Sequence, residues 1–404
     1  MPLSEIKNAK TFDNSGFAAF LALTTVATAM GIDGTLPLMP SIGIYFQTDK
    51  EAVQLSLSMF MLGVALGQLI HGPISDRFGR KPAILGGLLL TSASTIGCAL
   101  SNSVEMLIFF RFLHGITASS GWLIARAVIR DRHDRDGAAR VLSLMLVFHG
   151  IAPLLSPVIG AHLCLAFGWQ AMFWFLALYS FLVALVFSLA FTETIKHKIP
   201  NALDLFPMFR NFSEIIQTGS FWSYTGCAAA AYGILFAFLS DSSHIIITTF
   251  GESEAEYSYM FAGCMLGSFI GMLLSAKATV HWGADRVLRW GVCSAIVFGG
   301  LLATLAWLAV NHWVAVIAPM FMMMIAFALI FPASIAGVLQ PFPHIAGSAS
   351  SLVGFVQQII GALTGIAVTA LSDGTQSALA NGVLFWSIIA FVVYWAGVRK
   401  FRTI

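Results

Sequence analysis

The sequence predicts an all-α, polytopic membrane protein in which twelve transmembrane helices form two pseudo-symmetric six-helix bundles. Its 404 residues are 58% hydrophobic and 10% charged, whereas soluble domains carry about 25% charged residues. Apolar runs of about 20 residues or more, the length that spans a bilayer as a helix, recur along the chain, and basic residues gather between alternate runs. No polar region is long enough for a separate soluble domain.

The twelve apolar runs are the predicted spans. Barrel strands would appear instead as short segments of alternating polarity. The first run follows Lys7 and Lys10, is too long for a signal-peptide core and lacks an A-x-A exit, so it is predicted to be an uncleaved span. The runs cover residues 17–44, 53–74, 82–101, 104–128, 139–165, 170–192, 221–247, 256–276, 286–310, 312–338, 346–371 and 378–398.

The basic residues predict the orientation. With the N-terminus in the cytoplasm, all but two of the 21 lysines and arginines fall in cytoplasmic segments or at the cytoplasmic ends of spans. The exceptions are Lys50, which lies outside, and Arg111, which lies within a span. By the positive-inside rule both termini are expected in the cytoplasm. The residues counted as cytoplasmic are Lys7, Lys10, Arg77, Arg80, Lys81, Arg126, Arg130, Arg132, Arg135, Arg140, Lys196, Lys198, Arg210, Lys277, Arg286, Arg289, Arg399, Lys400 and Arg402.

The predicted domains are an N-terminal bundle (1–192), a cytoplasmic linker (193–220) and a C-terminal bundle (221–404). Within the linker, residues 203–216 are expected to form an interfacial helix on the inner surface. A weak repeat supports two halves, because two glycines at the loop between spans two and three are repeated 204 positions later, between spans eight and nine: Gly79 with Gly283, and Gly87 with Gly291. Parallel six-helix halves with a site near the membrane midplane are a transporter plan.

Asp33 is the first candidate site residue. It stands near the end of the first run, in a stretch with Gly31, Gly34, Pro37 and Pro40 that loosens the helix. A carboxylate at membrane depth is costly and is a functional candidate by default, so Asp33 is interpreted as the proton carrier. The alternative is an aspartate at a helix end that reaches interfacial water.

Arg111 lies inside span four, where a guanidinium has to face the bundle interior and find an anion, a carbonyl or water. It is expected near Asp33, where its charge would favour the carboxylate. The alternative places it at the outer interface, about two turns inside the helix.

The loop between spans two and three carries Gly72-Pro73-Ile74-Ser75-Asp76-Arg77-Phe78-Gly79-Arg80-Lys81-Pro82. Gly79 and Pro82 suit a tight turn, and Asp76 could cap or face a helix N-terminus. Arg77, Arg80 and Lys81 would hold the loop at the anionic inner surface. A purely topogenic basic loop is the alternative.

Span five contains Pro153, Ser156, Pro157 and Gly160. Small residues four apart allow close helix approach, and the prolines remove backbone hydrogen bonds and bend the helix. From these residues alone, a proline-kinked packing helix is an equally good interpretation.

Polar groups in span seven and before span five are candidates for substrate binding. Asp241 and His244 lie near the outer end of span seven, and Asp241 could share one cavity with Asp33, although an interfacial pair is the alternative. His149 could line the cavity, or could be a packing residue. The five cysteines lie in apolar runs without C-x-x-C and are interpreted as packing residues, and no metal site or cofactor is expected.

The loop motif resembles the G-x-x-x-D-R-x-G-R-[KR] pattern of the major facilitator superfamily. Val53 to Gln68, and Ala346 to Gln357 at the start of span eleven, are similar to the Bcr/CflA subfamily of drug:proton antiporters. The resemblance implies that Asp76 and its basic neighbours latch the two halves in one gating state. Val280 stands at the position 204 residues after Asp76, so only one such latch is expected.

The same resemblance covers the other motifs. Arg111 matches the arginine of an R-x-x-Q-G pattern that the family uses in proton coupling, with His114 in place of the glutamine. Span five resembles the antiporter motif G-x-x-x-G-P-x-x-G-G, which favours exchange over uniport. Asp241 and His244 depart from the subfamily, which has small residues and a proline there.

The leading hypothesis is a proton-coupled secondary active transporter that exports small amphipathic drugs or toxic compounds across the bacterial inner membrane by alternating access. The alternative is a dedicated carrier of one metabolite, peptide or siderophore. An enzyme or receptor is poorly supported, because H-E-x-x-H, Walker and G-x-S-x-G motifs are absent from the sequence. The expected partners are the cargo, protons and the lipid bilayer, with no nucleic acid and a monomeric state; sodium stays open as the coupled ion.

Overall fold

The computed structural model describes residues 14–400 except 134, 196–197, 199–204 and 344, and this part of the chain contains helices and no strand. Twelve helical segments in it are long and apolar enough to cross a membrane. The predicted fold class is therefore confirmed. Four of the basic residues used for orientation, Lys7, Lys10, Lys196 and Arg402, lie outside the described residues.

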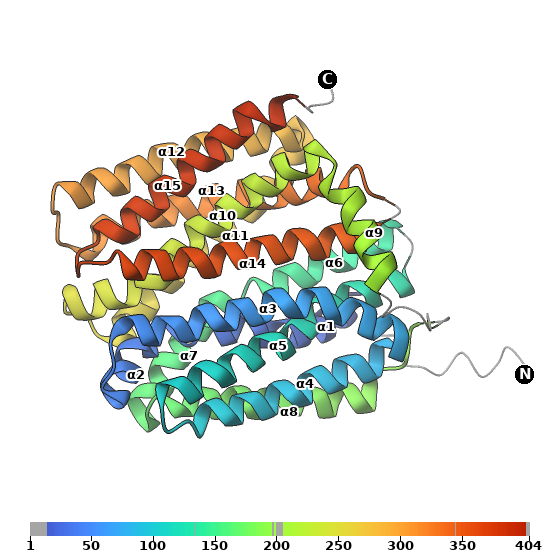
Figure 1. Cartoon of the computed structure of the whole chain (residues 1–404), viewed down its shortest axis with the longest axis horizontal. Helices are drawn as coiled ribbons and strands as arrows, with labels where there is room; N and C mark the ends of the chain where they lie inside the picture. Colours follow the sequence, from blue (N-terminus) through green and yellow to red (C-terminus); the bar gives the residue numbers. More distant parts are fainter. Residues whose placement is uncertain (1–13, 134, 196–197, 199–204, 344, 401–404) are drawn as a thin grey trace, which may run out of the picture.

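The first half of the chain lies in the lower part of Figure 1. Its elements are α1 (Asn14–Asp33), the short 3-10 helix η2 (Leu36–Leu38), α2 (Met39–Phe46), α3 (Lys50–Phe78), α4 (Arg80–Ala99), α5 (Val104–Arg132), α6 (Arg135–His149), α7 (Ala152–Phe167) and α8 (Gln170–Ala190).

The second half lies in the upper part of Figure 1. Its elements are α9 (Leu205–Ile216), α10 (Gly219–Ser243), the π-helical turn η3 (His244–Thr249), α11 (Glu254–Trp282), α12 (Ala284–Trp307), α13 (Trp313–Leu339), α14 (Ala346–Ala370), α15 (Ser377–Ala396) and η4 (Val398–Lys400).

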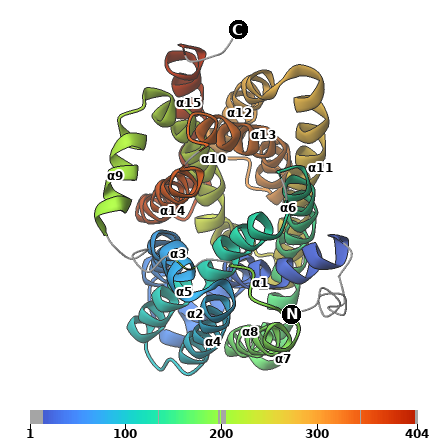
Figure 2. The same ribbon diagram turned by 90° about the vertical axis from the view of Figure 1, so that its right-hand side faces the viewer.

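The bundle has two ends, which we name by their elements. The terminal end, on the right of Figure 1, carries both ends of the described chain, the turn between α3 and α4, and α9; the distal end carries α2 and lies at the other side. Between the halves, α3 packs along α14 and α7 packs along α11. Figure 2, a view onto the terminal end, shows α3 next to α14.

Two predicted spans are interrupted rather than continuous. The run 17–44 ends its first helix at Asp33 and resumes through η2 and α2, because Pro37 and Pro40 cannot continue the hydrogen-bond ladder. The run 139–165 breaks between α6 and α7, with Pro153 in the first turn of α7. Both breaks lie beside candidate site residues, since Asp33 ends α1 and His149 ends α6.

The linker and the glycine repeat have counterparts in the structure. α9 forms within the expected stretch 203–216 and packs against α14 and α10, with Ile215 buried. Gly79 joins α3 to α4 with φ +113°, and Gly283 joins α11 to α12 with φ +79°. These left-handed conformations favour glycine and explain why it stands at both turns. The domain limits at 192 and 221 remain a prediction.

Candidate functional site

Asp33 lies at the broken end of α1 and is 8% exposed. No hydrogen bond or ion pair reaches its carboxylate from any residue that the structure describes. Tyr232 on α10 and Tyr257 on α11 lie close enough to interact with it electrostatically. Asp33 thus lies within range of groups on the second half of the chain, without a partner that fixes its charge.

The span-five motif packs directly against this end of α1. A Cβ built on Gly160 would lie 2.0 Å from the carbonyl oxygen of Gly34, so only glycine allows this approach. Ser156 and Pro157 are buried in the same helix, and Pro153 occupies its first turn. The motif therefore shapes the surroundings of Asp33 by close packing, as the packing interpretation of the sequence proposes.

Arg111 is buried, with 1% exposure, but it does not pair with Asp33. Its guanidinium donates to the carbonyl oxygen of Gly31 at 2.8 Å and to Thr35 Oγ1 at 3.3 Å. It also lies 4.5 Å from the ring centroid of Phe60. Within the described residues Arg111 therefore lies beside the Asp33 segment without an ion pair to its carboxylate, and its guanidinium binds the backbone carbonyl freed near the helix break. Arg111 thus bonds to residues on both sides of Asp33, namely Gly31 and Thr35.

A second polar chain crosses between the halves and includes a residue that the sequence analysis overlooked. His149 Nδ1 lies 3.1 Å from Thr25 Oγ1, and its ring lies 4.8 Å from that of Trp122. Arg126 stacks over Trp122 at 4.9 Å and donates to Ser350 Oγ on α14 at 3.0 Å. The structure thus places Arg126, which the charge pattern counts only among the cytoplasmic ends of spans, in contact with both halves of the bundle.

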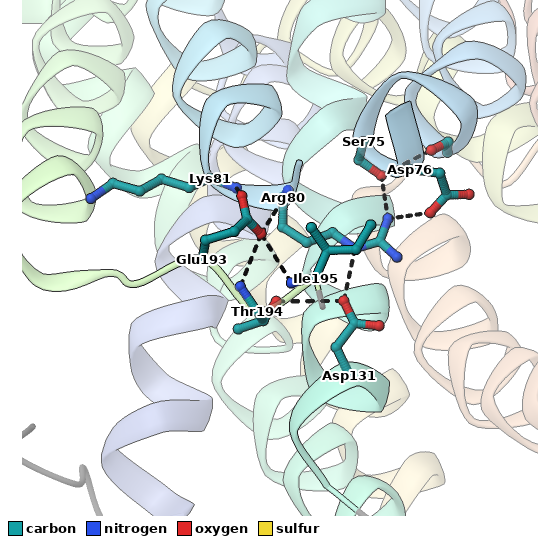
Figure 3. Close-up of polar contacts among 9 residues, drawn as sticks. Ser75, Asp76, Arg80, Lys81, Asp131, Glu193, Thr194 and Ile195 are labelled. Atoms are coloured by element: carbon teal, nitrogen blue, oxygen red, sulfur yellow. Dashed lines mark hydrogen bonds and ion pairs between the residues drawn. The ribbon is translucent and has the colours of Figure 1, made fainter. Parts of the chain in front are cut away.

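The loop motif forms an ion-pair network at the terminal end (Figure 3). Arg80 Nη1 lies 2.5 Å from Asp76 Oδ1 and donates to Ser75 Oγ at 2.6 Å, and Arg80 Nε lies 2.9 Å from Asp131 Oδ2 on α5. Gly72 lies earlier in α3 and Arg77 is exposed in its last turn. Within the described residues, the side chains of Asp76 and Arg80 bond only to groups of the first bundle, and the backbone N–H of Arg80 bonds to Glu193 at the start of the linker. The half-to-half latch that the resemblance implies is therefore not formed in this conformation.

Glu193, which the sequence analysis did not single out, caps α4 where Asp76 was expected to act. Its carboxylate accepts from the backbone N–H groups of Arg80 at 3.0 Å and Lys81 at 3.1 Å, and also from Thr194 and Ile195 (Figure 3). Partial burial raises the pKa of Glu193, but these four N–H donors outweigh it and hold the pKa below its usual value. Asp76 is turned toward Arg80 instead.

A cavity of about 480 Å³ lies near the distal end and is lined by α2, α3, α10, η3 and α14. Asp241 and His244 line it, together with Lys50 from the first half. Asp33 is not part of this lining, so the shared cavity expected for Asp33 and Asp241 is not formed in this conformation. In the sequence, Lys50 stands out only as a lysine predicted on the outer side of the membrane. That exception to the charge pattern is the feature that could have indicated this cavity.

Metal binding finds no support within the described residues, where no group of three or more His, Cys, Asp or Glu side chains could hold an ion. The polar groups described above lie in four places: the Asp33 segment with Arg111, the chain through Arg126, the loop network around Arg80, and the distal cavity.

The comparison with known sequences points to one family. The model described as Major Facilitator Superfamily matches residues 21–365. The chain is 27% identical over 381 residues to a bicyclomycin resistance protein homolog of Haemophilus influenzae, covering 94% of this chain and 95% of that protein. It is 28% identical over 331 residues to a chloramphenicol resistance protein of Pseudomonas aeruginosa, covering 80% and 76%.

The comparison with solved structures shows the same fold. A D-xylose-proton symporter superposes with a TM-score of 0.75 at 14% identity, covering 93% of this chain and 97% of that one. A bacterial homolog of the human lysosomal transporter Spinster, in an inward-facing and unoccupied conformation, gives a TM-score of 0.69 at 19% identity, covering 95% and 97%.

Proposed function

The chain belongs to the major facilitator superfamily, and from this premise we propose that it exports small amphipathic compounds, drugs among them, in exchange for protons. As a member of this family it is a multi-pass bacterial inner-membrane transporter of small molecules, not an enzyme. The names of its relatives, which refer to bicyclomycin and chloramphenicol resistance, support export of such compounds.

The observation that carries proton coupling is the unpaired carboxylate of Asp33 at the break of α1. A charge away from water is costly without a partner, so a proton or a polar group of the cargo would lower its energy. Arg111 holds the same segment through Gly31 and Thr35. A change in the charge of Asp33 would therefore act on the backbone around Gly34, against which α7 packs.

The proposed cycle uses this exchange. The terminal end, which carries most of the basic residues, faces the cytoplasm by the positive-inside rule. Cargo arriving from the cytoplasm competes with the proton for the site; protonation from outside releases the cargo, and the neutral acid lets the two halves return. In this scheme the loop network around Asp76 and Arg80 acts on gating at the cytoplasmic end.

The test uses proteoliposomes with an imposed proton gradient and a panel of small amphipathic compounds. Asp33→Asn keeps the shape of the side chain but cannot carry a proton, so uphill transport should fall to the level of empty liposomes while membrane insertion is unchanged. Glu105→Gln, in the exposed first turn of α5, is the matched control and should transport normally. Uphill transport by Asp33→Asn would refute the assignment, and a sodium gradient in place of protons tests the coupled ion.

The alternative, a dedicated carrier for one metabolite, peptide or siderophore, is favoured by the polar lining of the distal cavity. Asp241 and Lys50 give that cavity charges, and His244 gives it an imidazole, that a purely apolar drug site does not require. Growth tests with the gene deleted and overexpressed separate the two. Altered resistance to several unrelated antibiotics supports the exporter, whereas a defect confined to one nutrient or to iron limitation supports the carrier.

A further inference from the structure

The distal cavity contains buried oxygen atoms that no group of the described protein satisfies. Gln54 Oε1, Asp241 Oδ1 and Thr369 Oγ1 have no hydrogen-bond partner, and all three residues line the cavity. Gln54, Asp241 and Thr369 are 3%, 1% and 3% exposed, respectively. A buried acceptor without a partner costs about 1–3 kcal/mol, and more when it is charged. Three such atoms in one cavity indicate a ligand.

The kind of unpaired atom indicates the chemistry of that ligand. A carboxylate oxygen and an amide oxygen only accept hydrogen bonds. A partner for both must therefore bring donors, and the negative charge of Asp241 favours a donor with a positive charge. Met39, Ile44 and Val53 give the cavity an apolar part, and its volume of about 480 Å³ falls in the range of about 300–1,000 Å³ that suits a small organic molecule.

The ammonium group of Lys50 acts on the other carboxylate oxygen of Asp241, Oδ2, through the hydroxyl group of Ser372. Lys50 Nζ donates to Ser372 Oγ at 2.8 Å and to the carbonyl oxygen of Ser372 at 3.2 Å. Ser372 Oγ in turn donates to Asp241 Oδ2 at 2.7 Å. Lys50 thus acts on Asp241 through one hydroxyl group, which bonds Oδ2, while Oδ1 has no hydrogen-bond partner within the described protein.

The surrounding charges do not remove the preference for a cation. His244 and Asp373 act on Asp241 electrostatically besides Lys50, and Asp49 also lines the cavity. Lys50 comes from α3, whereas Asp241 and Ser372 belong to α10 and to the segment after α14. Any separation of the two halves at the distal end would remove Lys50 from the relay and leave Asp241 without its cation.

From these contacts we propose that the distal cavity is a subsite for the ammonium group of an amphipathic amine, which donates to Asp241 Oδ1 and Gln54 Oε1 while its apolar body contacts Met39, Ile44 and Val53. The positive charge of Lys50, which acts on the same carboxylate through Ser372, competes electrostatically with this ligand. This inference names a class of cargo for the proposed transporter. It rests on the proposed function only in the assumption that the cavity lies on the transport path. Binding itself is measurable without transport.

The experiment measures protection of a cysteine in the purified, full-length protein after replacement of its five native cysteines. Thr248→Cys, in the cavity lining, reports on occupancy through its rate of alkylation by uncharged N-ethylmaleimide. The probe is phenethylammonium, and the matched neutral compound is 2-phenylethanol at the same concentration. Asn311→Cys, in the exposed loop between α12 and α13 and outside the lining, is the control reporter.

If the inference is correct, phenethylammonium slows alkylation of Thr248→Cys and 2-phenylethanol does not, while Asn311→Cys is unaffected by either. Asp241→Asn should abolish the protection, and Gln54→Met, which changes no charge, should weaken it at least about threefold. Lys50→Gln should lower the half-protecting concentration at least about fivefold, since the competing ammonium is gone. Melting curves of each variant establish that it is folded.

Equal protection by 2-phenylethanol would show only an apolar pocket and would overturn the proposal. Protection that survives Asp241→Asn, or that is absent even in Lys50→Gln, would overturn it as well. The outcome is separable from the proposed function, because Asp33→Asn should retain the protection. If the unmodified protein shows no proton-driven transport, proton coupling is refuted, but this binding result still stands.

Discussion

At the scale of single residues, Arg111 shows how a buried charge is accommodated without a counter-ion. The guanidinium finds the carbonyl oxygen of Gly31, the hydroxyl of Thr35 and the face of Phe60. The sequence required a partner of this kind but could not say which one, because the helix break that frees the carbonyl depends on how η2 folds back after Asp33. Arg111 therefore positions the Asp33 segment.

Replacing Arg111 tests this positioning. Arg111→Lys keeps the charge but cannot reach Gly31 and Thr35 together, and losing one charge-assisted hydrogen bond costs about 1.5–3 kcal/mol. Proton-driven transport in proteoliposomes should fall by about 10-fold to 100-fold. Arg130→Lys, exposed on the same helix, should stay within twofold of the unmodified protein. Full activity of Arg111→Lys would show that the paired contacts are dispensable.

Glu193 gives a prediction at the surface. Its carboxylate holds the N-terminus of α4, so Glu193→Ala should cost about 0.5–1 kcal/mol, which lowers the melting temperature by about 1–2 °C. Glu51→Ala, exposed in the first turn of α3, should change it less.

The pH dependence of this effect follows from the direction of the pKa shift. The pKa of Glu193 is lowered in the folded protein from 4.5, so its stabilisation is fully present above that value and is lost as the pH falls through the lower, folded-state pKa. The difference in melting temperature between the unmodified protein and Glu193→Ala should therefore be constant near neutral pH and shrink only below about pH 4.5. A difference that already vanishes at pH 6 would contradict the cap.

At the scale of elements, the contact between α7 and the end of α1 depends on glycine. A Cβ on Gly160 would stand 2.0 Å from a backbone oxygen, which cannot move aside as a flexible side chain can. Overpacking of this kind costs about 1–3 kcal/mol. Because the contact borders Asp33, it links helix packing to the proposed proton site.

Gly160→Ala and Gly86→Ala form a matched pair. Both change a glycine inside a helix of the first half, but a Cβ on Gly86 meets nothing within 4 Å. Gly160→Ala should lower the melting temperature in detergent and reduce transport. Gly86→Ala should leave transport unchanged and stabilise the protein slightly, by about 0.5–1 kcal/mol. If both variants shift the melting temperature in the same direction, the close approach at Gly160 is not the cause.

At the scale of the whole molecule, α3 and α14 join the two halves through a polar seam. A Cβ on Gly365 would lie 3.1 Å from Gln54 Nε2 and 3.2 Å from Ser58 Oγ, and a Cβ on Gly354 would meet Gln68. Alternating access requires the halves to move relative to each other, so a covalent link at this seam is a direct test of the proposed cycle.

A pair of cysteine cross-links makes this test. Ser58→Cys with Gly365→Cys joins α3 to α14, whereas Ser94→Cys with Thr117→Cys joins α4 to α5 within the first half, where the two hydroxyl oxygens are 3.4 Å apart. In a background without native cysteines both pairs should oxidise, seen as a shift in gel mobility. Only the first should block transport, and reduction should restore it. Undiminished transport with the first link closed would contradict alternating access.

The repeating apolar runs and the basic loops were enough to determine a twelve-helix membrane protein, because the hydrophobic thickness of the bilayer fixes the length of each span. The glycines at 79 and 283 were likewise readable, since a left-handed turn between two helices favours that residue. Asp33 and Arg111 could be selected from sequence as charges in apolar surroundings.

Only the tertiary structure decided what those charges contact. Arg111 binds a carbonyl rather than Asp33, Glu193 replaces Asp76 at the N-terminus of α4, and Arg126 points into the bundle. The Lys50–Ser372–Asp241 relay joins residues more than a hundred positions apart. Hydropathy and charge patterns record the depth of a residue in the membrane, whereas its partners depend on how the helices rotate and pack against one another.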